Sequence, residues 1–101
     1  MRKLFLVIFI FSFFSTAFAD EKMDMGLNVY KEKAQCGTCH VLKSAESEGD
    51  IGPNLDQLKP KISQIIMAVT NGIGVMPAWE GILSKEEIEA VAYYVFNSTN
   101  K

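Results

Sequence analysis

Apolar residues recur at helical spacing in three stretches of this chain, from about Asp24 to Ala34, from about Lys61 to Asn71 and from about Lys85 to Asn97. Within each stretch they fall three or four residues apart, which places them on one face of a helix. The three stripes are Leu27, Tyr30 and Ala34; Ile62, Ile65, Ile66 and Val69; and Ile88, Val91, Ala92 and Val95. No stretch shows a strand pattern. The pattern therefore predicts an all-α fold.

Residues at the ends of these stretches are typical of helix boundaries. Pro60 suits the first turn of the second helix, and Gly72 ends that helix. Ser84 is placed as the N-cap of the last helix, where Glu87 completes a capping box. Between His40 and Pro60 lies a polar loop without an element of its own, which is unusual in a compact domain. Such a loop is easier to accept if it wraps a cofactor.

The N-terminus has the pattern of a secretory signal. An apolar run from Leu4 to Phe14 follows a short basic start, and the small residues Ala17 and Ala19 stand where a signal peptidase reads. The sequence thus predicts a signal peptide over residues 1–19, a mature domain over residues 20–101 and export to the periplasm. The alternative is an uncleaved membrane anchor. The apolar run is shorter than the ~20 residues of a spanning helix, so no membrane span is expected after cleavage.

Charge and size narrow the possible functions. Two of the 10 Lys and Arg residues precede the predicted cleavage site, whereas all 12 Asp and Glu residues follow it, so the mature domain has a net charge of −4. Nucleic-acid binding needs clustered basic residues and is not expected. An acidic domain is better suited to docking on a basic patch of a protein partner. A domain this small also needs a disulfide set, a metal or a cofactor to complete its core.

The two cysteines and the single histidine lie together, in the segment Cys36-Gly37-Thr38-Cys39-His40. A disulfide here closes so small a loop that it restricts the unfolded chain little. A structural zinc site wants four ligands where three are present, and a thioredoxin-like pair needs a preceding strand. A coincidental structural pair of cysteines is a further alternative. The interpretation that the segment favours is covalent haem attachment, for which C-x-x-C-H is the signature. We expect thioether bonds from both cysteines and axial ligation of the iron by the histidine.

Met76 is the candidate for the second axial ligand, because the chain has no second histidine. Gly72 and Gly74 release the backbone from helix around it, and Pro77 disfavours helical backbone at Met76. Met67 lies at the margin of the second helical stripe, where packing or surface exposure is the better interpretation. The alternative role for Met76 is to fill a gap in the core. A histidine–methionine pair raises the reduction potential of haem iron.

In the order of these motifs the chain resembles the small bacterial class I cytochromes c, over essentially all of the predicted mature domain. The shared order is a first helix, C-x-x-C-H, a loop containing Gly52-Pro53, a second helix, Met76-Pro77 and a last helix. The resemblance implies about three to four helices wrapped around one covalently bound haem c. The segment before Cys36 looks slightly longer than is usual in this family.

The resemblance also implies roles for individual residues. The carbonyl of Pro53 is expected to accept a hydrogen bond from the back nitrogen of the axial histidine. Trp79 is expected to line the haem pocket. Gly26 and Tyr94, with Tyr93 as the neighbouring alternative, are expected where the first and last helices cross. The side chains expected to keep water from the iron are Ile51, Leu55, Ile65, Val69, Ile73 and Val91.

The implied function is one-electron transfer in the periplasm, with no catalysis by the chain itself. Redox proteins that give and take the electron are expected to dock transiently beside one haem edge. One alternative is the cytochrome subunit or dedicated electron acceptor of a periplasmic dehydrogenase, for example a sulfite-oxidising enzyme. Others are a haem-based gas sensor or peroxidase, and a haem-free binding protein.

Overall fold

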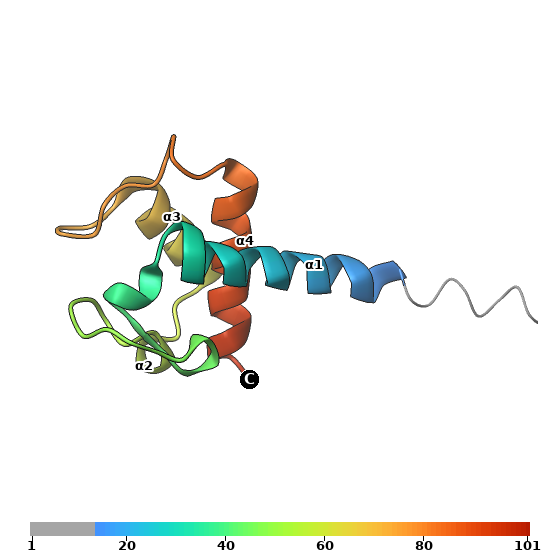
Figure 1. Ribbon diagram of the computed structural model, residues 1–101, viewed down its shortest axis with the longest axis horizontal. Helices are drawn as coiled ribbons and strands as arrows, with labels where there is room; N and C mark the ends of the chain where they lie inside the picture. The colour runs from blue at the N-terminus through green and yellow to red at the C-terminus, as the bar shows by residue number, and fades with distance from the viewer. Residues whose placement is uncertain (1–13) are drawn as a thin grey trace, which may run out of the picture.

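The computed structural model describes residues 14–101 of the chain (Figure 1). Helix α1 spans Phe14–Asn28 and crosses the last helix, α4, which spans Lys85–Thr99. Most of the predicted signal peptide lies outside the described residues, and the predicted cleavage position before Asp20 falls within α1. Across residues 14–101, no helix combines the length and the apolar character required to cross a membrane.

The crossing of α1 and α4 is built on Gly26. A Cβ atom there would lie 2.2 Å from the carbonyl oxygen of Ala90 and 2.5 Å from Cβ of Tyr94. Any larger residue would push the helices apart, so the predicted pairing of Gly26 with Tyr94 is confirmed. Tyr93 instead has the Lys22 ammonium 5.0 Å from its ring centroid. The buried core gathers around this crossing and includes Val29, Tyr30, Leu42, Ile65, Val69, Leu83, Ile88, Val91 and Val95.

The first helix differs from the prediction at both ends. Within the described residues it extends back to Phe14, ahead of the predicted start at Asp24, and beyond Asn28 it continues as a π-helical turn over Val29–Lys33. The Ala34 amide closes this turn by donating to the carbonyl of Val29 at 2.8 Å. A π turn spans one residue more than an α turn, which accommodates the long segment before Cys36.

The second and last helices are confirmed. Helix α3 spans Ile62–Asn71, and in α4 the two capping-box bonds between Ser84 and Glu87 measure 3.1 and 2.9 Å. Pro60 was expected in the first turn of α3, but it precedes the N-cap residue Lys61. The Lys61 amide donates to the Gln64 side chain at 2.9 Å, so the helix start has a polar cap of its own.

The expectation that residues 40–60 form a bare loop without a strand is wrong. Strands β1 (Val41–Leu42) and β2 (Ser47–Glu48) form a small antiparallel hairpin, with Leu42 opposite Ser47. Helix α2 follows at Leu55–Leu58 and is capped by the Asn54 side chain. Two-residue strands are too short to show a period of two, which is why the sequence pattern misses them. The fold class stays all-α.

Candidate haem site

The Cys36–His40 segment is a tight turn beside the core. Residues Cys36–Thr38 form a 3-10 turn, in which the carbonyl of Cys36 accepts from the amides of Cys39 (3.1 Å) and His40 (3.0 Å). Both cysteines are half-buried free thiols, so the structure does not contain the disulfide alternative. The turn holds the two sulfurs and the imidazole on one short piece of backbone, as covalent haem attachment requires.

The imidazole of His40 is fixed by its own loop. Its Nδ1 lies 2.7 Å from the carbonyl oxygen of Pro53. A carbonyl only accepts, so Nδ1 carries the proton and Nε2 is the nitrogen left for a metal ion. The ring also packs on Gly52, where a Cβ atom would lie 2.6 Å from the ring carbon Cε1. The Gly52 amide donates to the carbonyl of Cys39 at 2.7 Å, which joins this loop to the turn.

The pKa of the Cys36 thiol disfavours a thioredoxin-like pair of cysteines. Burial, followed by the charge of Cys39, raises the pKa of the Cys36 thiol to about 11. Thiol–disulfide exchange uses a lowered pKa, because the thiolate is the nucleophile. Zinc is disfavoured as well, since no three His, Cys, Asp or Glu side chains converge within residues 14–101.

Met76 lies in a second segment, which follows α3. The amide and carbonyl of Met76 pair with the carbonyl and amide of Ile73 at 2.9 and 3.1 Å, closing a tight loop. At Gly72 φ is +72°, and a Cβ atom there would lie 2.6 Å from the carbonyl oxygen of Met76. The Met76 side chain is half-buried and contacts the core. Met67 is 66% exposed, in keeping with the surface interpretation.

Trp79 anchors the far end of this segment. Its amide donates to the carbonyl of Val69 at 2.8 Å, and its carbonyl accepts from the amide of Leu83 at 2.9 Å. The indole is half-buried against the core. No hydrogen bond among residues 14–101 joins Met76 or Trp79 to His40. The two segments nevertheless lie on the same side of the α1–α4 crossing, the first in green and the second in orange (Figure 1).

The expected apolar shell divides into two groups. Ile65, Val69 and Val91 are buried and Leu55 is half-buried, whereas Ile51 and Ile73 are 66% and 68% exposed. Ile51 lies beside Gly52 in the loop that packs on His40, and Ile73 lies in the Met76 loop, where an apolar macrocycle would cover them. Two thiols, an imidazole with Nε2 available, a thioether and apolar loops together suit a covalently attached haem.

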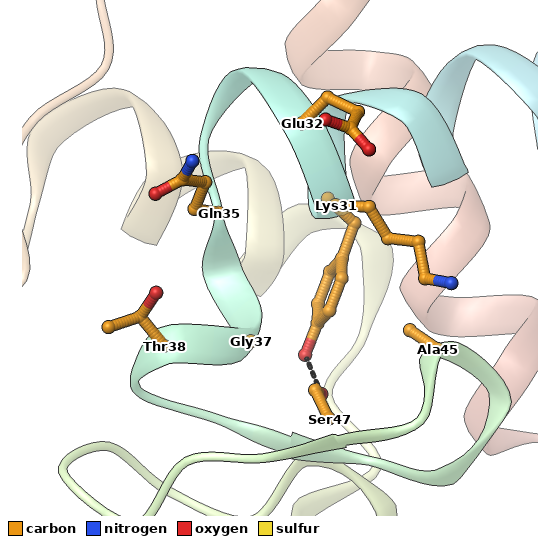
Figure 2. A pocket seen from close by; sticks show the side chains of 8 residues that line it. Lys31, Glu32, Gln35, Gly37, Thr38, Ala45 and Ser47 are labelled. Atoms are coloured by element: carbon orange, nitrogen blue, oxygen red, sulfur yellow. Dashed lines mark hydrogen bonds between the residues drawn. The ribbon is translucent and has the colours of Figure 1, made fainter.

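Ser47, which no sequence motif singles out, bonds to the backbone carbonyl of His40 through its hydroxyl at 3.0 Å. A hollow of about 400 Å³ opens beside the Cys36–His40 turn, and Tyr30, Gln35, Thr38 and Ser47 are among the residues that line it (Figure 2). Ser47 lies between the tyrosine and the turn. A serine in a polar loop carries no signal of this role in a single sequence, because its hydroxyl acts only once the hairpin has formed.

Comparisons with known proteins show the family of the chain. The family model described as "Cytochrome C oxidase, cbb3-type, subunit III" matches residues 21–95. The chain belongs to the cytochrome c family. Cytochrome c6 of Leptolyngbya boryana is 35% identical to it over 72 residues, which cover 67% of this chain and 85% of that protein. Chloroplastic cytochrome c6 of Chlamydomonas reinhardtii is 61% identical over 79 residues, covering 72% of this chain and 53% of that protein.

A solved structure supports the same assignment. The c-type cytochrome SorU from Sinorhizobium meliloti superimposes on this cytochrome c with a TM-score of 0.76 at 48% identity, covering 81% of this chain and 95% of that one. The predicted class I cytochrome c fold is therefore confirmed. This cytochrome c carries one covalently bound haem c and is a haem electron carrier.

Proposed function

We propose that this cytochrome c is an exported one-electron carrier of the periplasm. In this proposal Cys36 and Cys39 hold the haem through thioethers, and His40 and Met76 are the axial ligands of its iron. The observation that carries the proposal is the orientation and protonation of the His40 ring. Its Nδ1–H donates to the carbonyl of Pro53 at 2.7 Å, and the ring packs on Gly52, which leaves Nε2 for the iron. When bound, haem c supplies an iron that exchanges a single electron with a partner.

The chain's own contribution is to keep the two ligand segments in place. The Pro53 carbonyl orients the imidazole and raises its basicity through the Nδ1–H bond. The reciprocal backbone bonds between Ile73 and Met76 fix the loop that presents the thioether. Rigid ligand segments keep structural change small when the electron arrives or leaves. Trp79, half-buried at the end of the second segment, is proposed to line the haem pocket.

The expected partners are redox proteins with a basic docking patch. The predicted mature domain has a net charge of −4, which favours fast and transient docking on an oppositely charged surface. Such docking is salt-dependent, so electron transfer to the partner should slow as ionic strength rises. The N-terminal pattern of residues 1–19 supports export, and no catalytic activity is proposed for the chain.

The visible spectrum of the exported protein tests the axial ligands. In the oxidised parent we expect a weak sulfur-to-iron band in the red region, lost in Met76→Ala. Met67→Ala is the matched control, since it truncates an exposed methionine and should leave the band unchanged. A parent protein without the band, or a Met76→Ala variant that keeps it, would refute ligation by Met76.

Mass spectrometry tests the covalent attachment independently. The denatured chain, isolated from a host that matures c-type cytochromes, should carry the mass of one haem and begin at Asp20. Cys36→Ala and Cys39→Ala should each leave a single thioether, and the double variant should lose the mass. A chain that begins at Met1 would refute signal cleavage without affecting the assignment of the haem.

A further inference from the structure

A buried hydroxyl pair connects the first helix to the backbone of His40. The hydroxyl of Tyr30 lies 2.9 Å from Oγ of Ser47, drawn as a dashed line in Figure 2. The same Oγ lies 3.0 Å from the carbonyl oxygen of His40. Tyr30 is 1% exposed and Ser47 is half-buried. Neither residue belongs to the haem-attachment motif, yet together they reach its histidine.

Each hydroxyl has one hydrogen and the carbonyl has none, which decides the donor and the acceptor of both hydrogen bonds. Two carbonyl oxygens lie near Oγ of Ser47, that of His40 at 3.0 Å and that of Leu42 at 3.5 Å, and both can only accept. The single hydroxyl hydrogen of Ser47 is assigned to the nearer of them, the carbonyl of His40. The oxygen of Ser47 must then accept from the hydroxyl of Tyr30. Burial raises the pKa of Tyr30 to about 12, so this hydroxyl stays protonated, and remains a donor, throughout the neutral range. Hydrogen bonds that point the same way in series strengthen one another.

Packing leaves Ser47 little freedom to move. A Cβ atom at Gly37 would lie 2.6 Å from Cβ of Ser47 and 3.6 Å from the Tyr30 ring. Glycine at this position of the turn therefore lets the hairpin strand approach closely. Ser47 also lies opposite the fully buried Leu42 in the hairpin register. The serine hydroxyl is held against the turn from two directions.

We propose that Tyr30 and Ser47 are positioning residues that orient His40 through its backbone carbonyl. We call the series Tyr30–Ser47–His40 the hydroxyl relay. His40 is then held at three atoms. Its amide donates to the carbonyl of Cys36 and its Nδ1–H donates to the carbonyl of Pro53. Its own carbonyl accepts from the hydroxyl of Ser47. The relay rests on the proposed function, since the orientation of the imidazole matters to the extent that His40 binds the iron.

A second tyrosine–serine pair, formed by the core residue Tyr94 and the exposed Ser44, is the control. The hydroxyl of Tyr94 lies 2.9 Å from Oγ of Ser44, the same distance as in the relay. The two tyrosine rings pack on each other with centroids 6.0 Å apart, and Tyr94 is 3% exposed. Within residues 14–101, no hydrogen bond connects Tyr94 or Ser44 to the Cys36–His40 turn. Tyr94→Phe therefore removes an equivalent hydroxyl without touching His40.

Two measurements on the haem-loaded protein test the hydroxyl relay. The first is the set of hyperfine-shifted proton resonances of the axial histidine and the haem methyl groups in the oxidised protein, which report the orientation of the imidazole. The second is native-state hydrogen exchange at the His40 amide, which reports opening of the turn. Tyr30→Phe and Ser47→Ala should move the resonances and accelerate exchange about fivefold, a factor that corresponds to ~1 kcal/mol.

The double variant makes the test sharper. Because the tyrosine acts only through the serine, Tyr30→Phe combined with Ser47→Ala should show no larger change than Ser47→Ala alone. Tyr94→Phe should leave both readouts at the parental values, even if it lowers the unfolding temperature as much as Tyr30→Phe does. Equal effects of Tyr94→Phe and Tyr30→Phe, or additive effects in the double variant, would overturn the relay.

Failure of the relay is distinguishable from failure of the proposed function. If the parent shows no hyperfine-shifted histidine resonances, His40 is not an axial ligand, and the proposed function and the relay's effect on the iron both fall. If the parent shows these resonances and neither Tyr30→Phe nor Ser47→Ala moves them, the ligand assignment stands and the relay is refuted.

Discussion

One methyl group added at Gly52 tests whether backbone contact holds His40 in place. A Cβ atom here would lie 2.6 Å from Cε1 and 2.9 Å from Nδ1 of the imidazole. The first distance is about 1 Å inside the ~3.5–4.0 Å at which carbon atoms attract. Gly52 is not among the glycines with positive φ, so the penalty of Gly52→Ala is steric.

The structure leaves two ways to relieve this overlap. The imidazole can tilt and lengthen its 2.7 Å bond to the Pro53 carbonyl, or the Gly52 backbone can retreat and lose its 2.7 Å bond to Cys39. Overpacking of this kind costs ~1–3 kcal/mol. In a domain of this size each kcal/mol lowers the unfolding temperature by about 4–8 °C. Gly52→Ala should therefore unfold roughly 4–24 °C below the parent.

Gly26→Ala is the matched control for Gly52→Ala. Its Cβ would lie 2.2 Å from the carbonyl oxygen of Ala90, at the α1–α4 crossing, and Gly26 also lacks a positive φ. Thermal unfolding should show both variants destabilised, with up to ~1 kcal/mol regained in Gly26→Ala from the higher helix propensity of alanine. Electron paramagnetic resonance of the oxidised haem should change only in Gly52→Ala. A Gly52→Ala variant that unfolds earlier but keeps the parental resonance would refute positioning of the ring by Gly52.

Two further predictions concern α4. Ser84→Ala removes the N-cap and should cost ~1 kcal/mol in thermal unfolding, whereas Ser63→Ala on exposed α3 surface should cost little; equal losses would contradict the cap. The Lys33 side chain, which bonds to Glu87, holds the pKa of that carboxyl below its usual 4.5. The stabilisation is thus present above pH 4.5 and lost as pH falls through the lower folded pKa, so Lys33→Met should flatten the acid dependence of urea unfolding. If the free energy of unfolding falls equally with acid in parent and variant, the Lys33–Glu87 bond does not stabilise the fold.

Features that depend on residues near one another in sequence were the most predictable. The capping box of Ser84 and Glu87, the end of α3 at Gly72 and the C-x-x-C-H turn each involve residues within a few positions of one another, and each is present. The close approach of Gly26 and Tyr94 spans the chain and came only from the family resemblance. The haem-binding assignments of individual residues remain predictions that the experiments above test.

Features created by the hairpin could not be predicted in this way. Strands β1 and β2 are two residues each, and their existence depends on Leu42 being fully buried and on Ser47 meeting Gly37. Neither contact produces a periodic pattern of apolar residues in the sequence. The π-helical turn was not predicted, because hydrophobic spacing over five residues does not separate α from π geometry.

The two proposed axial ligands are held by different kinds of contact, and this difference follows from where they lie in the fold. The His40 turn is packed on several sides, since Cβ atoms at Gly37, Gly49 and Gly52 would each meet a neighbour within 2.6 Å. The Met76 loop is closed at its base by backbone bonds between Ile73 and Met76, but its tip is open: among the described residues, a Cβ atom added at Gly74 would meet no atom within 4 Å other than those of its chain neighbours, and Val75 is 86% exposed. Local opening is easiest where few buried contacts are lost. We therefore expect the segment that carries Met76 to open before the turn that carries His40, because Ser47 links that turn to the buried Tyr30.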